Sequence, residues 1–251
     1  MSSVKFAATK LSSAGKKGIL TPDENGYYTM CIGALNVFNS AGAYYTLEGA
    51  KTLFEKSSVF MRRIANGNMK GEFGHPKKTP GMTMDDYVNR IHIIEETNVC
   101  CHFKEIWLDE NYGKNNPQLK NAQLVGIMAK VKPSGPKGQA LKESFENPDE
   151  NVNFSIRSLS NDYYERGQLY KVVKSIICFD AVTEPGLSMA NKWDNPALES
   201  FDEVFVTLKQ VERIVTTESM VATEDSKIIA MESLAMFDKP AANNKPLYNK
   251  W

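Results

Sequence analysis

Two neighbouring segments in the second half of the chain carry the apolar and polar alternation of β-strands. In residues 151–159, Phe154 and Ile156 face one way while Ser155 and Arg157 face the other, because successive side chains of a strand point to opposite faces. A second long strand is predicted over residues 169–180, after a polar stretch. We therefore expect a sheet in which Ser155 and Arg157 share one face.

The remaining periodicity adds strands and a few helices. Strands are predicted over residues 27–37, 87–95, 99–108 and 123–131, and helices over residues 46–65, 140–145, 195–215 and 225–237, where apolar residues recur at helical spacing. The pattern predicts an α+β, mainly β fold, namely a closed or nearly closed antiparallel β-barrel of about six to seven strands with peripheral helices. The long Pro- and Gly-containing connection before residue 151 is a candidate substrate-gating element.

Length and local composition suggest one principal domain with two appendages. A chain of 251 residues can bury one substantial core. Residues 1–22, rich in Ser, Ala, Lys and Gly, are expected to form a flexible N-terminal arm. Residues 23–190 are expected to hold the β-barrel, and residues 191–251 a C-terminal helical region and tail.

Charge and cysteine content exclude several classes of function. Thirty basic and thirty acidic side chains balance to a formal net charge of 0, so neither nucleic acid nor a membrane is the expected partner, and a protein is. The four cysteines, at positions 31, 100, 101 and 178, lack zinc-site spacing and are read as reduced cytoplasmic thiols. No apolar run approaches the roughly 18–20 residues that span a bilayer. No cofactor and no metal site are predicted.

Residues 71–76, Gly-Glu-Phe-Gly-His-Pro, place a histidine on a rigid bend. Gly74 permits a backbone conformation in which a side chain would clash, and Pro76 pushes His75 towards extended geometry. A general base must be held at a fixed distance from its nucleophile. His75 is therefore a candidate base.

These motifs resemble those of the prohead proteases of tailed double-stranded DNA phages. The hexapeptide resembles that family's Gly-Glu-Leu-Gly-His-Pro signature, and residues 39–45, Asn-Ser-Ala-Gly-Ala-Tyr-Tyr, resemble its Asn-x-Asn-Gly-Arg-x-Tyr segment. Downstream, Ser-Ile-Arg-Ser at residues 155–158 resembles the Ser-x-Arg nucleophile strand. Residues 179–185, Phe-Asp-Ala-Val-Thr-Glu-Pro, resemble the element that follows it. Four blocks in the right order, over roughly residues 23–190, are more specific than any one of them.

The resemblance implies a fold, an activity and a biological setting. The fold would be that of prohead proteases and of the distantly similar herpesvirus maturational protease. The activity would be that of a serine endopeptidase that cleaves phage scaffold or core and capsid proteins during prohead maturation, with autoprocessing. The setting would be the host cytoplasm, inside the prohead, and a homo-oligomer is a further expectation.

Carried onto this chain, the resemblance and the chemistry assign Ser155 as nucleophile and His75 as base. Asp180 is the expected third member, which orients the imidazole and stabilises its charged form. Arg157 is expected either to organise the oxyanion donors and contact substrate or to pair with a carboxylate. The third role stays open also to His92, His102, Glu95 and Glu105.

Two chemical rivals and one structural rival remain. A cysteine protease would use Cys100, Cys101 or Cys178 with His92 or His102, and a metal site would need ligand spacing that the sequence lacks. A catalytically silent capsid or tail-tube component could keep the same fold.

The family's preference for glutamate would need a basic side chain near the nucleophile. The candidates are Arg157, Arg90 and Lys104. Ala-x-Glu sequences ending at Glu199, Glu224 and Glu232 are candidate autolysis sites.

Overall fold

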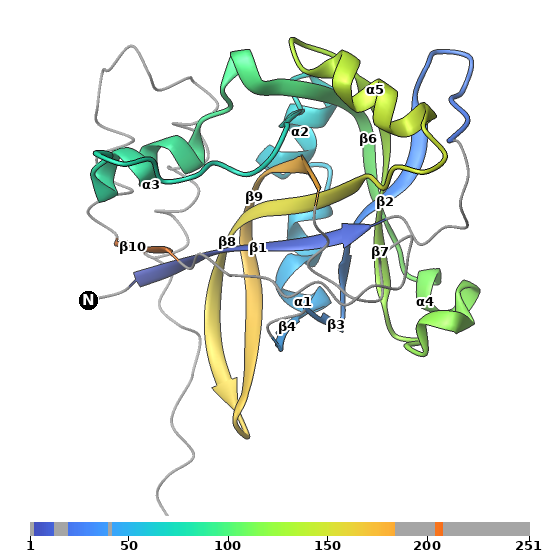
Figure 1. Cartoon of the computed structure of the whole chain (residues 1–251). Helices are drawn as coiled ribbons and strands as arrows, with labels where there is room; N and C mark the ends of the chain where they lie inside the picture. Colours follow the sequence, from blue (N-terminus) through green and yellow to red (C-terminus); the bar gives the residue numbers. More distant parts are fainter. Residues whose placement is uncertain (1–2, 13–19, 40–41, 184–203, 208–251) are drawn as a thin grey trace, which may run out of the picture.

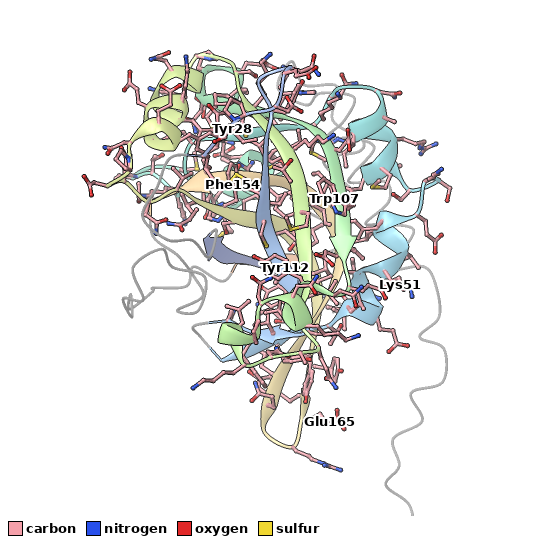
Figure 2. All side chains as sticks on the ribbon, turned by 90° about the vertical axis from the view of Figure 1, so that its right-hand side faces the viewer. Tyr28, Lys51, Trp107, Tyr112, Phe154 and Glu165 are labelled. Carbon is pink, nitrogen blue, oxygen red and sulfur yellow. The ribbon has the colours of Figure 1, made fainter. Side chains whose placement is uncertain are left out.

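The structure is a computed structural model that describes residues 3–12, 20–39, 42–183 and 204–207. Its larger sheet has six strands in the order β10–β1–β8–β9–β4–β3. These are β1 (Ser3–Ser12), β3 (Val37–Phe38), β4 (Ala43–Tyr45), β8 (Asn153–Glu165), β9 (Gln168–Val182) and β10 (Val204–Thr207). All pairs are antiparallel except β4 with β9. The β8–β9 hairpin projects well beyond the rest of the sheet (Figure 1), with Glu165 at its tip (Figure 2).

The smaller sheet is antiparallel and packs against the larger one. Its four strands run in the order β2–β7–β6–β5, with β2 at Tyr28–Leu35, β5 at Lys70–Glu72, β6 at Val99–Asp109 and β7 at Val125–Pro133. The Phe103 ring on β6 has its centroid 5.8 Å from that of Phe154 and 6.1 Å from that of Phe179. All three rings are fully buried, and each such burial contributes roughly 2 kcal/mol. The core thus lies between the two sheets.

Short helices cover the outside of this core (Figure 1). They are α1 (Leu47–Ala50), η1 (Lys51–Phe54), α2 (Val59–Ala65), α3 (Met84–His92), η2 (Glu96–Asn98), α4 (Tyr112–Asn115), η3 (Pro117–Leu119) and α5 (Gly138–Glu146). The α5 helix contacts β6 and β7, while α2 contacts β6 and β9. No helix within the described ranges is long and apolar enough to cross a membrane.

The expected barrel is not closed. The larger and smaller sheets are separate hydrogen-bonded ladders, and an isolated parallel bridge between Phe73 and Ala181 links them next to β5 and β9. The mainly β class is confirmed, but a closed, wholly antiparallel barrel is wrong in the part of the chain that the structure describes. The strand alternation that predicts sheets does not specify whether the last edges meet.

The strand predicted over residues 87–95 is wrong, because residues 84–92 form α3. Thr83 caps this helix through a capping box with Asp86, and two acidic residues in the first turn suit the positive end of the helix dipole. Tyr87, Val88 and Ile91 are buried, at helical rather than alternating spacing. Local capping therefore outweighs the strand preference of the isoleucines.

The helix predicted over residues 46–65 is interrupted. The α1 and η1 segments end before Glu55, whose backbone is extended, and α2 starts after Ser58, whose side chain accepts a hydrogen bond from the Met61 amide. Ser58 is therefore the N-cap of a separate helix, and the predicted helix is divided at residues 55–58.

Two terminal expectations also differ from the structure. Residues 3–12 of the expected arm form β1, which pairs with β8 and β10. Residues 204–207, expected to be helical, form β10. The helix expected over residues 225–237 lies outside the described residues, and the domain division at residues 22 and 190 stays a prediction.

Candidate active site

The β8–β9 ladder places two of the expected site residues directly opposite each other. In its antiparallel register Ser155 faces Asp180, and Arg157 faces Cys178. Because side chains alternate along a strand, all four lie on one side of the pair, while Phe154 and Ile156 point to the inter-sheet core. Ser155, Arg157 and Asp180 have no exposed surface.

The third residue, His75, is delivered by the chain that leaves β5. The Phe73–Ala181 bridge and a 2.6 Å hydrogen bond from the Gly74 amide to the Ala181 carbonyl fasten this segment to the end of β9. Gly74 has a φ of 84°, a left-handed conformation that favours glycine. On the far side, the hydroxyl of Tyr87 in α3 donates to the Pro76 carbonyl at 3.2 Å. The bend expected at His75 is thus held at both ends.

The three side chains make a continuous hydrogen-bonded line. His75 Nε2 lies 2.5 Å from Ser155 Oγ, and His75 Nδ1 lies 2.8 Å from Asp180 Oδ2. A carboxylate only accepts hydrogen bonds, so the neutral tautomer with the proton on Nδ1 satisfies both contacts. In that state the serine hydroxyl donates to Nε2. The His75 side chain keeps 15% of its surface exposed.

Asp180 is held as a carboxylate by its neighbours. Burial alone would raise its pKa, but the charge of Arg157 and the hydrogen bond from His75 outweigh burial and lower the pKa to about 2. The Glu72 amide donates to Oδ1 at 3.1 Å, and the Cys178 thiol donates to the same oxygen at 3.2 Å. Asp180 is therefore ionised at neutral pH.

Arg157 is a buried partner of Asp180. Its Nε and Nη2 donate to the two carboxylate oxygens of Asp180 at 2.9 and 2.8 Å. Its Nη1 donates to the carbonyls of Ile91 and Ile93 at 3.2 and 3.1 Å, and Nη2 also lies 3.2 Å from Glu72 Oε1. A guanidinium has five N–H donors, and four of them make these hydrogen bonds, while the contact with Glu72 is an ion pair. The expected pairing of Arg157 with a carboxylate is present, and its role towards the oxyanion or the substrate stays a prediction.

Sequence reasoning gave no role to Glu72, which is fully buried beside Arg157. Its carboxylate binds the Arg90 guanidinium through both oxygens, and the Asn98 side chain and the Glu95 amide also donate to it. The one sequence feature that could have indicated a role for Glu72 is its place as the only acidic residue in the hexapeptide that carries His75. Arg90 was considered only as a substrate contact, because α3 was expected to be a strand.

The other residues considered for the third role are elsewhere. His92 Nδ1 donates to the Val88 carbonyl at 2.8 Å, and His102 lies between the Tyr27 hydroxyl and the Gly67 carbonyl at 3.1 and 3.0 Å. Glu95 pairs with Arg90, and Glu105 pairs with Lys130. None of these contacts involves Ser155 or His75.

The cysteines lack the features of nucleophiles. All four are buried as free thiols. Burial is the main cause that raises the pKa of Cys31, Cys101 and Cys178, and a thiol is a poor nucleophile when its thiolate is disfavoured. Among the residues that the structure describes, no group of three or more His, Cys, Asp and Glu is arranged to hold a metal ion.

The candidate glutamate-recognition residues have other partners. Arg157 and Arg90 pair with carboxylates as described above, and Lys104 Nζ lies over the Tyr27 ring, 5.5 Å from its centroid. The Ala-x-Glu sequences lie outside the described residues. The structure therefore leaves the glutamate preference as a prediction.

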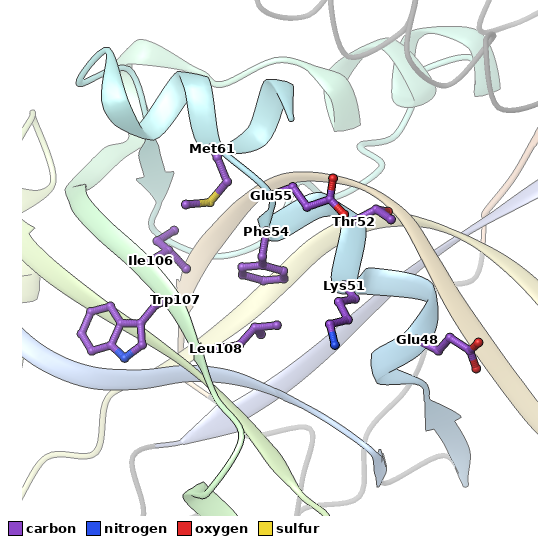
Figure 3. Close-up of a pocket in the computed structure, with 9 residues that line it drawn as sticks. All are labelled: Glu48, Lys51, Thr52, Phe54, Glu55, Met61, Ile106, Trp107 and Leu108. Carbon is purple, nitrogen blue, oxygen red and sulfur yellow. The ribbon is translucent and has the colours of Figure 1, made fainter. Parts of the chain in front are cut away.

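A pocket of about 470 Å³ lies apart from these side chains, between the η1–α2 region and β6 (Figure 3). Its lining is Glu48, Lys51, Thr52, Phe54, Glu55, Met61, Ile106, Trp107 and Leu108. None of these is a residue of the hydroxyl, imidazole and carboxylate line, so the pocket is not that site.

The site has the hydroxyl, imidazole and carboxylate arrangement that recurs in hydrolases on unrelated folds. The sequence matches the Peptidase S80 family over residues 6–241, and the chain belongs to this family. It is therefore a protease, and the resemblance to phage prohead proteases predicted from the four motif blocks is confirmed.

One curated relative and one solved structure are similar to this chain. The chain is 33% identical over 241 residues to the capsid maturation protease of Pseudomonas phage phiKZ, covering 92% of this chain and 87% of that protein. It is also similar to the structure of the bacteriophage T4 capsid assembly protease, with a TM-score of 0.48 and 14% identity over 72% of this chain and 99% of that one.

Proposed function

We propose that the protein is a serine endopeptidase in which Ser155 is the nucleophile, His75 the general base and Asp180 the residue that orients His75. The observation that carries the proposal is the line of two contacts, 2.5 Å from Ser155 Oγ to His75 Nε2 and 2.8 Å from His75 Nδ1 to Asp180 Oδ2. A base must lie within hydrogen-bonding reach of the proton that it removes.

The chemistry follows from these positions. Ser155 Oγ attacks the carbonyl carbon of a peptide bond as its proton passes to His75 Nε2, which gives a tetrahedral intermediate and an imidazolium. Asp180 stabilises that imidazolium and fixes its tautomer. His75 then gives the proton to the leaving amine, and water hydrolyses the acyl-enzyme by the same route. Because Ser155 has no exposed surface, part of the covering chain must move before a peptide reaches it.

Arg157 acts as a positioning residue in this proposal. Its fork grips both oxygens of Asp180, which fixes the carboxylate in the plane in which it meets His75 Nδ1. The role is proposed because Arg157 is fully buried and its contacts lead to Asp180 and Glu72.

Family membership and the likeness to the phiKZ capsid maturation protease make the protein a phage prohead maturation protease. Its substrates are the scaffold or core and capsid proteins of the same phage, which it cleaves inside the prohead in the host cytoplasm. It also processes itself within residues 191–251 and forms a homo-oligomer. The catalytically silent alternative loses support, because a silent component has no need of a base in contact with a buried serine.

The test uses the full chain together with its own scaffold and capsid proteins. Ser155→Ala should abolish their cleavage and leave thermal unfolding close to that of the wild type. Ser158→Ala is the matched control, because Ser158 is equally buried on the same strand. Full activity in Ser155→Ala would exclude this nucleophile.

A second measurement tests the class and the autoprocessing. A fluorophosphonate probe should label the wild type at Ser155, as located by peptide mass spectrometry. After incubation, the wild type should lose part of residues 191–251, while Ser155→Ala should keep Trp251. A wild-type chain that stays intact to Trp251 contradicts the autoprocessing part alone.

A further inference from the structure

The carboxylate of Glu72 links two arginines behind the candidate triad. Arg90 Nη1 donates to Glu72 Oε1 at 3.0 Å and Arg90 Nη2 donates to Oε2, while Arg157 Nη2 lies 3.2 Å from Oε1. The side chain of Glu72 has no exposed surface, and that of Arg90 keeps 19%. The Arg90 guanidinium and the Glu72 carboxylate are fixed relative to each other, because two planar groups joined by paired hydrogen bonds have one preferred orientation.

The charges alternate along a single line that ends at the imidazole. In order they are Arg90, Glu72, Arg157 and Asp180, and Asp180 contacts His75. Arg157 alone would neutralise the Asp180 carboxylate and weaken its support of an imidazolium. Glu72 supplies the balancing negative charge on the other side of Arg157, and its backbone amide also binds Asp180 Oδ1.

We propose that Glu72 is a positioning residue for the protease reaction, holding Arg157 in the orientation that grips Asp180 and balancing its charge, with Arg90 holding Glu72 in turn. The inference rests on the proposed function of Ser155, His75 and Asp180, because Glu72 acts through them. It assigns a purpose to the acid that precedes His75 by three residues in the same segment, and to the placement of α3, which supplies Arg90.

Three other titratable groups lie around this line of charges. Cys178 on β9 contacts Asp180, His92 on α3 is buried close enough to Arg157 to be affected by its charge, and Glu95 pairs with Arg90 at the surface. None of them changes in the variants below. A buried positive charge left without its partner opposes formation of the imidazolium, and a buried negative charge favours it.

The experiment measures fluorophosphonate labelling of Ser155 in the full chain as a function of pH, so that the identity of the peptide substrate is not needed. Glu72→Gln should lower the labelling rate at neutral pH about tenfold, a size typical of residues that orient catalytic groups. It should also move the acidic limb of the profile to lower pH by roughly 0.5–1 unit.

Arg90→Gln should move the same limb in the opposite direction, because it leaves an extra negative charge. The double variant Glu72→Gln/Arg90→Gln restores the charge balance and should bring the limb back towards the wild type. A purely structural role would lower the amount of folded protein without these opposed shifts. The matched control is Glu96→Gln, which removes the same charge from an exposed ion pair with Lys70 and should change neither rate nor profile.

Failure of this inference is distinguishable from failure of the proposed function. Wild-type labelling at Ser155 with an unchanged rate and profile in folded Glu72→Gln overturns the inference and leaves the function standing. The inference is also overturned if the acidic limb of the pH profile moves in the same direction in Glu72→Gln and in Arg90→Gln. If Glu72→Gln does not fold, the double variant Glu72→Gln/Arg90→Gln takes its place. A pH profile of labelling in the double variant that is still displaced from that of the wild type contradicts the charge balance. A wild type that is not labelled, together with an active Ser155→Ala, overturns both.

Discussion

Replacing Arg157 by methionine removes a buried cation and leaves its partner in place. Methionine has a similar reach, so most of the packing of the aliphatic stem is kept. Asp180 would remain fully buried, with contacts from His75, the Glu72 amide and Cys178 but without the two donors of the fork. The change therefore isolates the electrostatic part of the network.

The size of the effect can be worked from the contacts. Removing one partner of a buried, hydrogen-bonded ion pair costs roughly 3–5 kcal/mol, because a charge is left uncompensated. In the wild type the pKa of Asp180 falls from 3.8 to about 2, so ionisation of Asp180 contributes roughly 2 kcal/mol to stability near neutral pH. We expect the Arg157→Met variant to lose about 3–5 kcal/mol at pH 7.

The sign of the pH dependence separates charge from packing. In the wild type the folded pKa of Asp180 is depressed, so its contribution is present above pH 3.8 and is lost as the pH falls from there to about 2. Without Arg157, burial is the largest remaining influence and raises the pKa of Asp180 in the variant. Protonation then relieves the buried charge, so the stability difference between wild type and variant should shrink between pH 7 and pH 4.

Urea unfolding of both proteins at pH 7 and pH 4 makes the comparison. The matched control is Arg62→Met, because Arg62 is exposed in the last turn of α2 and should cost less than about 1 kcal/mol at either pH. The double variant Arg157→Met/Asp180→Asn should recover part of the loss. An equal loss at both pH values would mean that the cost is packing, and the electrostatic account of Arg157 would be wrong.

Three further predictions address other parts of the fold. Gly71→Ala should lower the melting temperature strongly, because the added Cβ would lie 2.3 Å from the Phe179 carbonyl oxygen. The comparison is Gly81→Ala, which meets no neighbouring atom and should cost only about 1 kcal/mol, from the φ of 86° at that position. Burial lowers the pKa of His92 below 6.5, so acidification from pH 7 to pH 5 protonates the unfolded chain first and destabilises the fold. In His92→Gln the free energy of unfolding should therefore fall less between pH 7 and pH 5 than it does in the wild type. Iodoacetamide at pH 8 should leave proteolysis unchanged in the native protein, since all four thiols are buried, and loss of activity before unfolding would contradict this.

Local patterns predicted the part of the site that depends on alternation. The sequence places Ser155 and Arg157 on one face of a strand and Asp180 at the end of the next, and the β8–β9 register pairs Ser155 with Asp180. That result needed only the two-residue period and a hairpin connection, both of which are local.

The contacts that complete the site are long-range, and local patterns do not encode them. His75 is separated by 80 positions from Ser155 and by 105 from Asp180. The assignment of His75 therefore depended on resemblance to a family, and the role of Glu72 was missed because its partners lie on α3 and β8. The apolar residues Ile91 and Ile93 favoured a strand there, and the capping box at Thr83 was the competing signal that decided the structure.

The link between the two sheets lies next to the site. The sheets are separate ladders, joined beside β5 and β9 by the Phe73–Ala181 bridge. Here Gly71 permits close approach to the Phe179 carbonyl, and Phe73 and Gly74 make the contacts with Ala181. Gly74 then takes a left-handed conformation, with a φ of 84°, immediately before His75. His75 thereby reaches Ser155 and Asp180 on the face opposite the core, where polar side chains can be gathered without disrupting inter-sheet packing.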